Sequence, residues 1–218
     1  MTSPILKEKA KEVARRLARE YPDAECALVH KNPFELLVAT ILSAQCTDER
    51  VNQVTPAVFA HFPTPQAMSS ADPEELEDLI RPTGFFRNKT KSLLGMSKVI
   101  SEEYGGEVPK KMDQLTRIPG VGRKTANVIR SVAFDLPGLP VDTHVMRLSK
   151  RLGLTKNTNP VKIEYELNEM VAPKQRGRFS LRLILHGRAV CVARTPRCEQ
   201  CVLADICPSS TVPVRKKR

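Results

Sequence analysis

The sequence predicts an all-α protein, and three observations support this prediction. Helix-capping residues followed by proline recur along the 218 residues, at Ser3-Pro4, Asn32-Pro33 and Asp72-Pro73, and such pairs are typical of helix starts. Several segments place apolar residues at helical spacing. No stretch alternates apolar and polar residues for long enough to predict a β-strand. The chain is long enough for one large domain or two small ones.

The first two helices are expected after Ser3 and after Asn32. The first has its apolar residues on one face, namely Leu6, Ala10, Val13 and Leu17. The second, ELLVATILSAQ, is apolar almost all round and is expected to be buried. Glu35 stands near its start, where an acid can complete a capping box.

The later helices follow the same signals. Asp72-Pro73 opens one helix, and Gly84 interrupts the chain before a basic helix expected over roughly residues 88–104. Gly105-Gly106 ends that helix. Two helices are expected to flank the turn IPGVG, and three more are expected near residues 143–152, 160–171 and 178–190.

The formal charge of +11 indicates a polyanionic partner, and nucleic acid is the first candidate. A solvated basic surface without a partner is the alternative. No stretch approaches the roughly 18 apolar residues of a membrane span, and the N-terminus has no signal-peptide pattern. We therefore expect a cytoplasmic protein that works on the nucleoid without membrane contact. In that reducing compartment clustered thiols bind metal more often than they form disulfides.

Residues 115–129, LTRIPGVGRKTANVI, predict a helical hairpin that binds phosphate. Gly120 and Gly122 allow a sharp turn with outward-facing amides at the start of a helix, while Val121 anchors the turn in the core. Arg123 follows in the first helical turn. An ordinary corner between helices is the alternative, but the apolar residues on both sides and the basic charge favour DNA binding.

Lys124 and Asp142 are the candidate catalytic residues. Lys124 stands at the positive end of a helix dipole, which favours the neutral amine that a covalent lysine nucleophile needs. For a lone lysine, a phosphate contact is the simpler interpretation. Asp142, in LPVDTHVMRL, is expected to cap the next helix and also to exchange protons in a cleft. Together, an amine and a carboxylate beside a phosphate-binding hairpin suit attack on the C1′ atom of a nucleotide.

Four cysteines in a 17-residue window, at positions 191, 198, 201 and 207, predict a metal centre. Zinc and an iron–sulfur cluster are both candidates. Only Cys198 and Cys201 have knuckle-like spacing, so one four-thiolate cluster fits better than a paired zinc site. Arg194 and Arg197 lie in the loop between Cys191 and Cys198, where they can reach a phosphate backbone. Cys26 and Cys46 lie outside this pattern and are expected to be small buried residues.

With these motifs in place, the chain closely resembles the endonuclease III family, which are helix-hairpin-helix DNA glycosylases with lyase activity. The resemblance runs from FELLVATILSAQCTDERVN through IPGVGRKTANV, VDTHVMR and LILHGR to the cysteine segment. It implies two helical domains with DNA in a cleft between them. One is a six-helix barrel over residues 26–136 that contains the hairpin. The other combines residues 1–25 with 137–218 and holds a [4Fe-4S] cluster on Cys191, Cys198, Cys201 and Cys207.

The resemblance also implies the chemistry. Lys124 matches the family's Schiff-base lysine and Asp142 its catalytic aspartate. The implied substrate is duplex DNA with a damaged, oxidised pyrimidine or an abasic site, cut on the 3′ side by β-elimination and handled by a monomer. Gln45 matches a residue that fills the gap left by the flipped base. Phe85 stands where relatives often carry a smaller apolar wedge, so we expect it to stack into the duplex and alter substrate preference.

Two other functions compete with this interpretation. The related glycosylase that removes adenine opposite oxidised guanine has a similar hairpin and cysteine spacing, but it usually lacks a lysine at the position of Lys124. It also carries a long extra domain after its cysteines, whereas this sequence ends 11 residues after Cys207. A DNA-binding redox sensor without catalytic activity is the second alternative, and Lys124 together with Asp142 argues against it.

Overall fold

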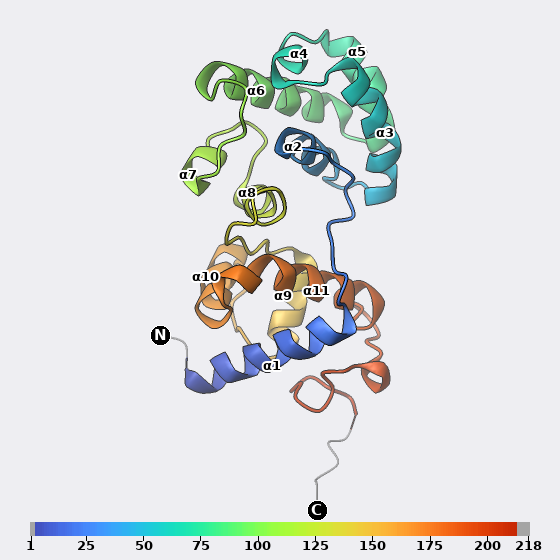
Figure 1. Ribbon diagram of the computed structural model, residues 1–218. Coiled ribbons are helices and arrows are strands. Elements are labelled where there is room, and N and C mark those ends of the chain that lie inside the picture. The colour runs from blue at the N-terminus through green and yellow to red at the C-terminus, as the bar shows by residue number, and fades with distance from the viewer. Residues whose placement is uncertain (1–2, 213–218) are drawn as a thin grey trace, which may run out of the picture. The chain divides into compact units, whose positions relative to one another are not determined.

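The computed structural model describes residues 3–212, which form helices and connecting loops with no β-strand among them (Figure 1). The predicted all-α class is confirmed. The described chain divides into two compact units. The first unit contains the residues up to Glu25 and those from Leu136 onward, and the second is the continuous segment Cys26–Asp135.

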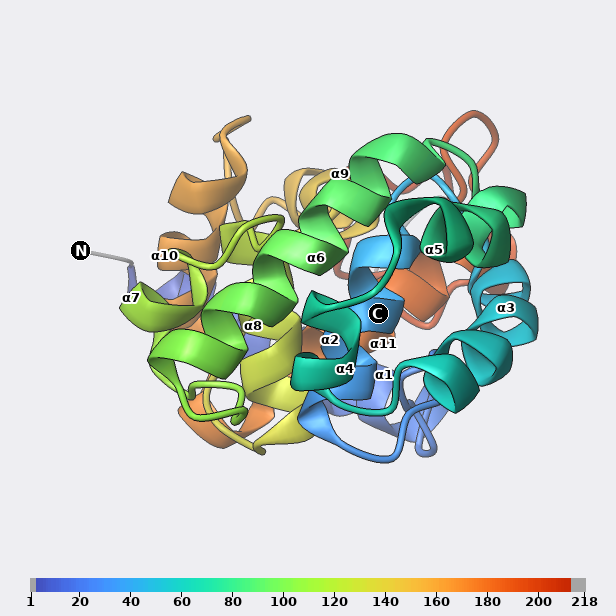
Figure 2. The ribbon, with the colours of Figure 1, turned by 90° about the horizontal axis from the view of Figure 1, so that it is seen from above.

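The second unit is built around a central apolar helix. Its elements are α2 (Pro33–Leu42), α3 (Asp48–His61), α4 (Pro65–Ser69), α5 (Pro73–Ile80), the 3-10 turn η1 (Arg81–Thr83), α6 (Phe86–Glu103), α7 (Met112–Leu115), α8 (Arg123–Val128) and the π-turn η2 (Ile129–Ala133). α2 contacts α3, α6, α8 and η2, and Figure 2 shows it lying among them. Eight of its ten residues are buried, as its sequence predicted.

The start of α2 uses a variant of the expected capping box. The Asn32 side chain accepts a hydrogen bond from the Glu35 amide at 2.9 Å. The Glu35 carboxylate reaches back to the amide of Lys31, at 2.7 Å, rather than to that of Asn32. The first hydrogen bond satisfies an amide in the first turn of the helix, and the second satisfies the amide just before the cap. Together they fix the helix start.

The first unit joins the N-terminal helix to the part of the chain from Leu136 onward. Its elements are α1 (Pro4–Glu20), α9 (Thr143–Arg151), α10 (Pro160–Met170), the 3-10 turn η3 (Pro173–Gln175), α11 (Arg176–Ala189) and the 3-10 turn η4 (Cys198–Gln200). α1 packs against α10 and α11 through Ala10, Val13 and Leu17, which are fully buried. Leu6, expected on the same face, is only half-buried. Leu203 brings the cysteine segment into this core.

The structure differs from the sequence expectations in the following respects. α6 begins at Phe86, two residues before the expected start, because Phe85 turns the chain in a left-handed conformation. α3 and α4 were not expected from the sequence, although Thr47 and Thr64 cap them through their side chains. Cys26 and Cys46 are not fully buried: they are partly exposed and pack against the edge of the core.

Within residues 3–212, no helix is both long enough and apolar enough to cross a membrane.

Candidate functional site

The hairpin between α7 and α8 is anchored by apolar side chains, and both of its glycines are exposed. Ile118 and Val121 are buried, and the Val121 amide donates to the Ile118 carbonyl at 3.0 Å. Gly120 has a φ of +77°, and a Cβ there would lie 2.8 Å from the Cβ of Ser92 on α6. Gly122 has an ordinary φ of −82°, and a Cβ there would meet no atom within 4 Å. Both glycines are exposed, but only Gly122 has room for a side chain, because Gly120 packs closely against Ser92.

Lys124 lies in the first turn of α8, two residues after Gly122, and its side chain is exposed. Arg123 precedes it and is half-buried. The buried face of α8 is formed by Ala126 and Asn127. The helix thus turns this buried side into the second unit and leaves the lysine accessible to a large substrate.

Asp142 caps α9, as the sequence predicted. One carboxylate oxygen, Oδ1, accepts a hydrogen bond from the Val145 amide at 2.8 Å. Within the described residues the other oxygen accepts no hydrogen bond, and the side chain is partly exposed. Ser180 on α11 donates to the Pro140 carbonyl at 2.5 Å, which holds the segment of chain that leads into the cap. Asp142 belongs to the first unit and Lys124 to the second.

Gln45 and Phe85, the two residues expected to enter the duplex, share an unusual backbone. Their φ values are +54° and +50°, in the left-handed region that residues other than glycine rarely adopt. Both are exposed, Phe85 to 62%. Its neighbour Phe86 lies under the guanidinium of Arg81, 4.6 Å from the ring centroid, so Phe85 is the ring left standing out. Strain of this kind costs about 1–3 kcal/mol per residue and is common at binding sites.

The four clustered cysteines line one pocket in the first unit, with a volume of about 420 Å³ that includes its open mouth. Apolar side chains, among them Leu148, Leu152 and Leu203, form much of its wall. In residues 3–212 no three His, Cys, Asp or Glu side chains converge as ligands of a single metal ion. A four-iron cluster does not require such convergence, because each thiolate binds a different iron.

Hydrogen-bond donors surround these sulfur atoms. Arg151 of α9 reaches the Sγ of Cys191 at 3.3 Å and the carbonyl of Val192 at 2.8 Å. The Leu203 amide donates to the Sγ of Cys201 at 3.4 Å. Burial raises the pKa of the Cys201 thiol, and a bound metal cation is what deprotonates such a thiol. The sequence singled out the four cysteines but not Arg151, whose contacts to this segment span 40 residues.

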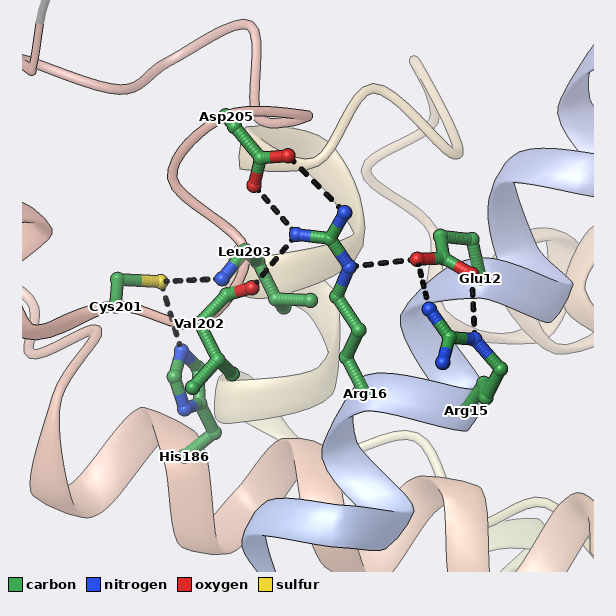
Figure 3. A network of polar contacts seen from close by, with 8 residues as sticks. All are labelled: Glu12, Arg15, Arg16, His186, Cys201, Val202, Leu203 and Asp205. Carbon is green, nitrogen blue, oxygen red and sulfur yellow. Dashed lines mark hydrogen bonds and ion pairs between the residues drawn. The ribbon is translucent and has the colours of Figure 1, made fainter.

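His186 forms a second link to the cluster segment, shown in Figure 3. It is 1% exposed, and its Nε2 lies 3.2 Å from the Sγ of Cys201. Its Nδ1 lies 3.1 Å from the hydroxyl of Tyr21, just beyond α1. Burial lowers the pKa of His186 to about 4, so the neutral ring is favoured. A neutral ring serves both contacts when Nε2–H donates to sulfur and Nδ1 accepts from Tyr21.

Arg16 of α1 ties the N-terminal helix to the same segment (Figure 3). Its guanidinium donates to the Val202 carbonyl at 2.9 Å and to the Asp205 carboxylate at 3.0 Å. It also pairs with Glu12, one turn earlier on α1. Hydrogen bonds from Arg15 and Arg16 lower the pKa of Glu12 to about 2. The cysteine segment is therefore held from α1 as well as from α9 and α11.

Arg194 and Arg197 lie on the exposed loop between Cys191 and Cys198. Within the described residues neither guanidinium has a hydrogen-bond or ion-pair partner. The amide of Arg197 donates to the Val190 carbonyl at 3.0 Å, which closes the loop at its base.

Comparison with known proteins identifies the family. Residues 38–173 match the model of the HhH-GPD superfamily base excision DNA repair protein, and residues 191–207 match the iron-sulfur binding domain of endonuclease III. The endonuclease III of Synechocystis sp. is 53% identical over 205 residues, 94% of each chain. The chain belongs to the endonuclease III family.

Solved structures of endonuclease III agree with this assignment. A non-covalent endonuclease III–DNA complex matches 93% of this chain and 95% of its own, with a TM-score of 0.88 and 42% identity. A trapped endonuclease III–DNA covalent intermediate matches with the same TM-score and identity, over 93% and 96% of the two chains. As a member of the family, the protein is a base-excision-repair DNA glycosylase with AP lyase activity and carries a [4Fe-4S] cluster. The pocket fits that cluster, because it gathers four thiols among N–H donors.

Proposed function

We propose that the protein removes oxidised pyrimidines from double-stranded DNA and then cuts the strand on the 3′ side of the abasic site, with Lys124 as the nucleophile. The observation that carries this proposal is the placement of an exposed lysine on the first turn after a hairpin whose Gly122 backbone is accessible. A phosphate held at that turn brings a neighbouring sugar within reach of the amine.

The proposed reaction begins when the Lys124 amine attacks C1′ of the flipped nucleotide. The bond from C1′ to the base breaks, the base leaves with a proton, and the amine loses one proton. The sugar ring then opens at the C1′–O4′ bond, O4′ takes up a proton, and a protonated Schiff base forms between C1′ and the lysine nitrogen. Removal of a proton from C2′ then expels the 3′ oxygen, which cuts the strand, and water releases the lysine. Oδ1 of Asp142 caps α9, and the second carboxylate oxygen of Asp142 is the proposed proton acceptor in these steps.

The proposed DNA contacts fall into two groups. Gly120, Val121, Gly122 and Arg123 of the hairpin, with Arg194 and Arg197 of the cysteine loop, contact phosphates and carry no base preference. Gln45 fills the gap left by the flipped base and Phe85 stacks beside it, so these two residues set which lesion and opposite base are accepted. Their exposure and left-handed backbones support this role.

The proposed ligands of the cluster are Cys191, Cys198, Cys201 and Cys207, which line the same pocket. When bound, the cluster joins the last segment of the chain into one body and so aims the loop that carries Arg194 and Arg197. The protein is proposed to act as a monomer in the cytoplasm, on the nucleoid, to which its charge of +11 attracts it.

Borohydride trapping tests the proposed chemistry. Wild-type protein should give a covalent adduct on duplexes that contain thymine glycol or an abasic site, and Lys124→Ala should give none. Lys91→Ala, which removes another exposed lysine of the same unit, is the matched control and should trap as the wild type does. An adduct that persists in Lys124→Ala would place the nucleophile elsewhere. Excision of adenine opposite oxidised guanine, with no action on thymine glycol, would favour the adenine glycosylase alternative.

A further inference from the structure

Lys89 is a buried lysine on α6 that no motif in the sequence singles out. It is 5% exposed, and no carboxylate contacts its ammonium group within residues 3–212. Its Nζ instead donates to two backbone carbonyls, those of Leu42 and Thr83, each at 2.8 Å. These acceptors are 47 and 6 residues away in sequence, so one ammonium group joins two separate parts of the chain.

Both carbonyls stand at the same kind of position. Leu42 is the last residue of α2, and the chain beyond it carries Gln45. Thr83 is the last residue of η1, and the chain beyond it carries Phe85. Lys89 therefore lies at the shared base of the two loops that present the strained, exposed residues.

The chemistry of this arrangement favours function over stability. Taking an ammonium group out of water is costly, and burial lowers the pKa of Lys89. Two charge-assisted hydrogen bonds offset part of that cost. A methionine or leucine would fill the same space without the cost of burying a charge, but it would leave both carbonyls without this donor and could not hold them together. What the lysine adds is a fixed distance between the two loops.

We propose that Lys89 is a positioning residue that couples the Gln45 loop to the Phe85 loop, so that both side chains enter the duplex as one rigid unit. This inference rests on the DNA contacts proposed above for Gln45 and Phe85. Neither left-handed residue is a glycine, so each loop relaxes toward other conformations when Lys89 no longer holds the carbonyl at its start. One ammonium group that holds the carbonyls at the start of both loops keeps Gln45 and Phe85 arranged for DNA before it binds. This lowers the entropic cost of ordering the two side chains on binding.

Lys89→Met tests the coupling, because it keeps the length of the side chain and removes its donors. Lys91→Met, an exposed lysine two residues along the same helix, is the matched control. The first readout is the ratio of affinities for a duplex with a non-reactive abasic analogue and for an undamaged duplex. The second is the fluorescence of 2-aminopurine placed opposite the analogue, which rises when that base loses its stacking. We expect Lys89→Met to lower the affinity ratio about tenfold or more and to reduce the fluorescence rise, with the salt dependence of binding unchanged.

A cycle of variants then tests whether Lys89 acts through the two loops. In a Gln45→Ala/Phe85→Ala background, Lys89→Met should cause no further loss of the affinity ratio. A further loss of the same size, or a full affinity ratio in Lys89→Met alone, would overturn the coupling. Should the methionine variant melt too early for binding measurements, Lys89→Gln replaces it, since a shorter amide can reach one carbonyl but not both, and a full ratio there overturns the coupling as well.

The proposed function is tested by a separate measurement from the one that tests the coupling. Wild-type trapping on thymine glycol depends on Lys124 and not on Lys89, so a wild type that traps no adduct refutes the proposed function. An active wild type whose affinity ratio is unaffected by Lys89→Met refutes only the positioning role. A Gln45→Ala/Phe85→Ala variant with a full ratio refutes the DNA contacts, and the coupling with them.

Discussion

Gly120 and Gly122 lie in one turn but are glycines for different reasons. Gly120→Ala should destabilise the protein by about 1–3 kcal/mol, because its φ is +77° and the new Cβ would meet Ser92 at 2.8 Å. Gly122→Ala meets no atom and no strain, so its melting temperature should match the wild type. Its affinity for DNA should nevertheless fall, since the methyl group would stand where we propose that a phosphate approaches the backbone. Circular dichroism and a binding isotherm give both quantities, and undiminished affinity in Gly122→Ala would mean that the turn is only structural.

Asp142 combines a structural and a proposed chemical role that one substitution separates. Asp142→Asn keeps an oxygen to accept the Val145 amide, so folding and DNA binding should persist. Single-turnover excision should fall about a hundredfold or more, because an amide does not take up the proton. Asp72→Asn makes the same change in the cap of α5 and should leave the rate unchanged. A near-normal rate in Asp142→Asn would reduce Asp142 to a helix cap.

The sequence alone indicated the individual residues whose residue type already suggests a chemical role. A lysine, an aspartate and four cysteines stand out because few other residues do their work. Lys89, Arg151 and His186 do not stand out, since their partners are backbone carbonyls or sulfur atoms remote in sequence. The left-handed backbones of Gln45 and Phe85 do not stand out either, because neither residue is a glycine, the type that usually marks such a conformation.

Helices were predicted where a cap and a proline coincide with an apolar pattern. α3 was missed although Thr47 caps it, because Pro56 lies inside the helix and its apolar residues are interspersed with polar ones. Proline at such a position normally ends a helix. α4, with five residues, is too short to show a periodic pattern. In both cases the helix is stabilised by packing within the second unit, because its local sequence preference alone is weak.

The salt dependence of DNA binding tests the proposed phosphate contacts of the loop between Cys191 and Cys198. Replacing Arg194 and Arg197 by alanine should weaken binding to damaged and undamaged duplexes alike. The slope of log affinity against log salt should fall by about one unit for each lost phosphate contact. Lys7→Ala/Lys162→Ala removes two exposed charges from the same unit and is the matched control. A slope equal to that of the control would make the arginines ordinary surface charges, while iron content should stay constant in both variants.

The cluster should determine the stability of one unit and not of the whole chain. Purified protein should be yellow-brown and contain about four irons, and Cys198→Ser should lose both colour and iron. Hydrogen exchange should then rise in α1, α9 and α11, which hold the cysteine segment through Arg16, Arg151 and His186. α2 and α6 should stay protected, because the second unit has its own core. Cys26→Ser is the control and should keep its iron, whereas colourless active protein with stoichiometric zinc would contradict the assignment.

The discontinuity of the first unit has a consequence for the order in which the newborn chain folds. Residues 26–135 form a continuous unit, so they can fold as soon as they have left the ribosome. α1 is made before this unit, yet α10 and α11, which cover Ala10, Val13 and Leu17, are made after it. At about 5–20 residues per second, that apolar face waits on the order of ten seconds for its partners. During this interval the nascent chain is exposed to chaperones and proteases at its oldest end, and with the proposed ligands iron loading has to wait until Cys207 has been made.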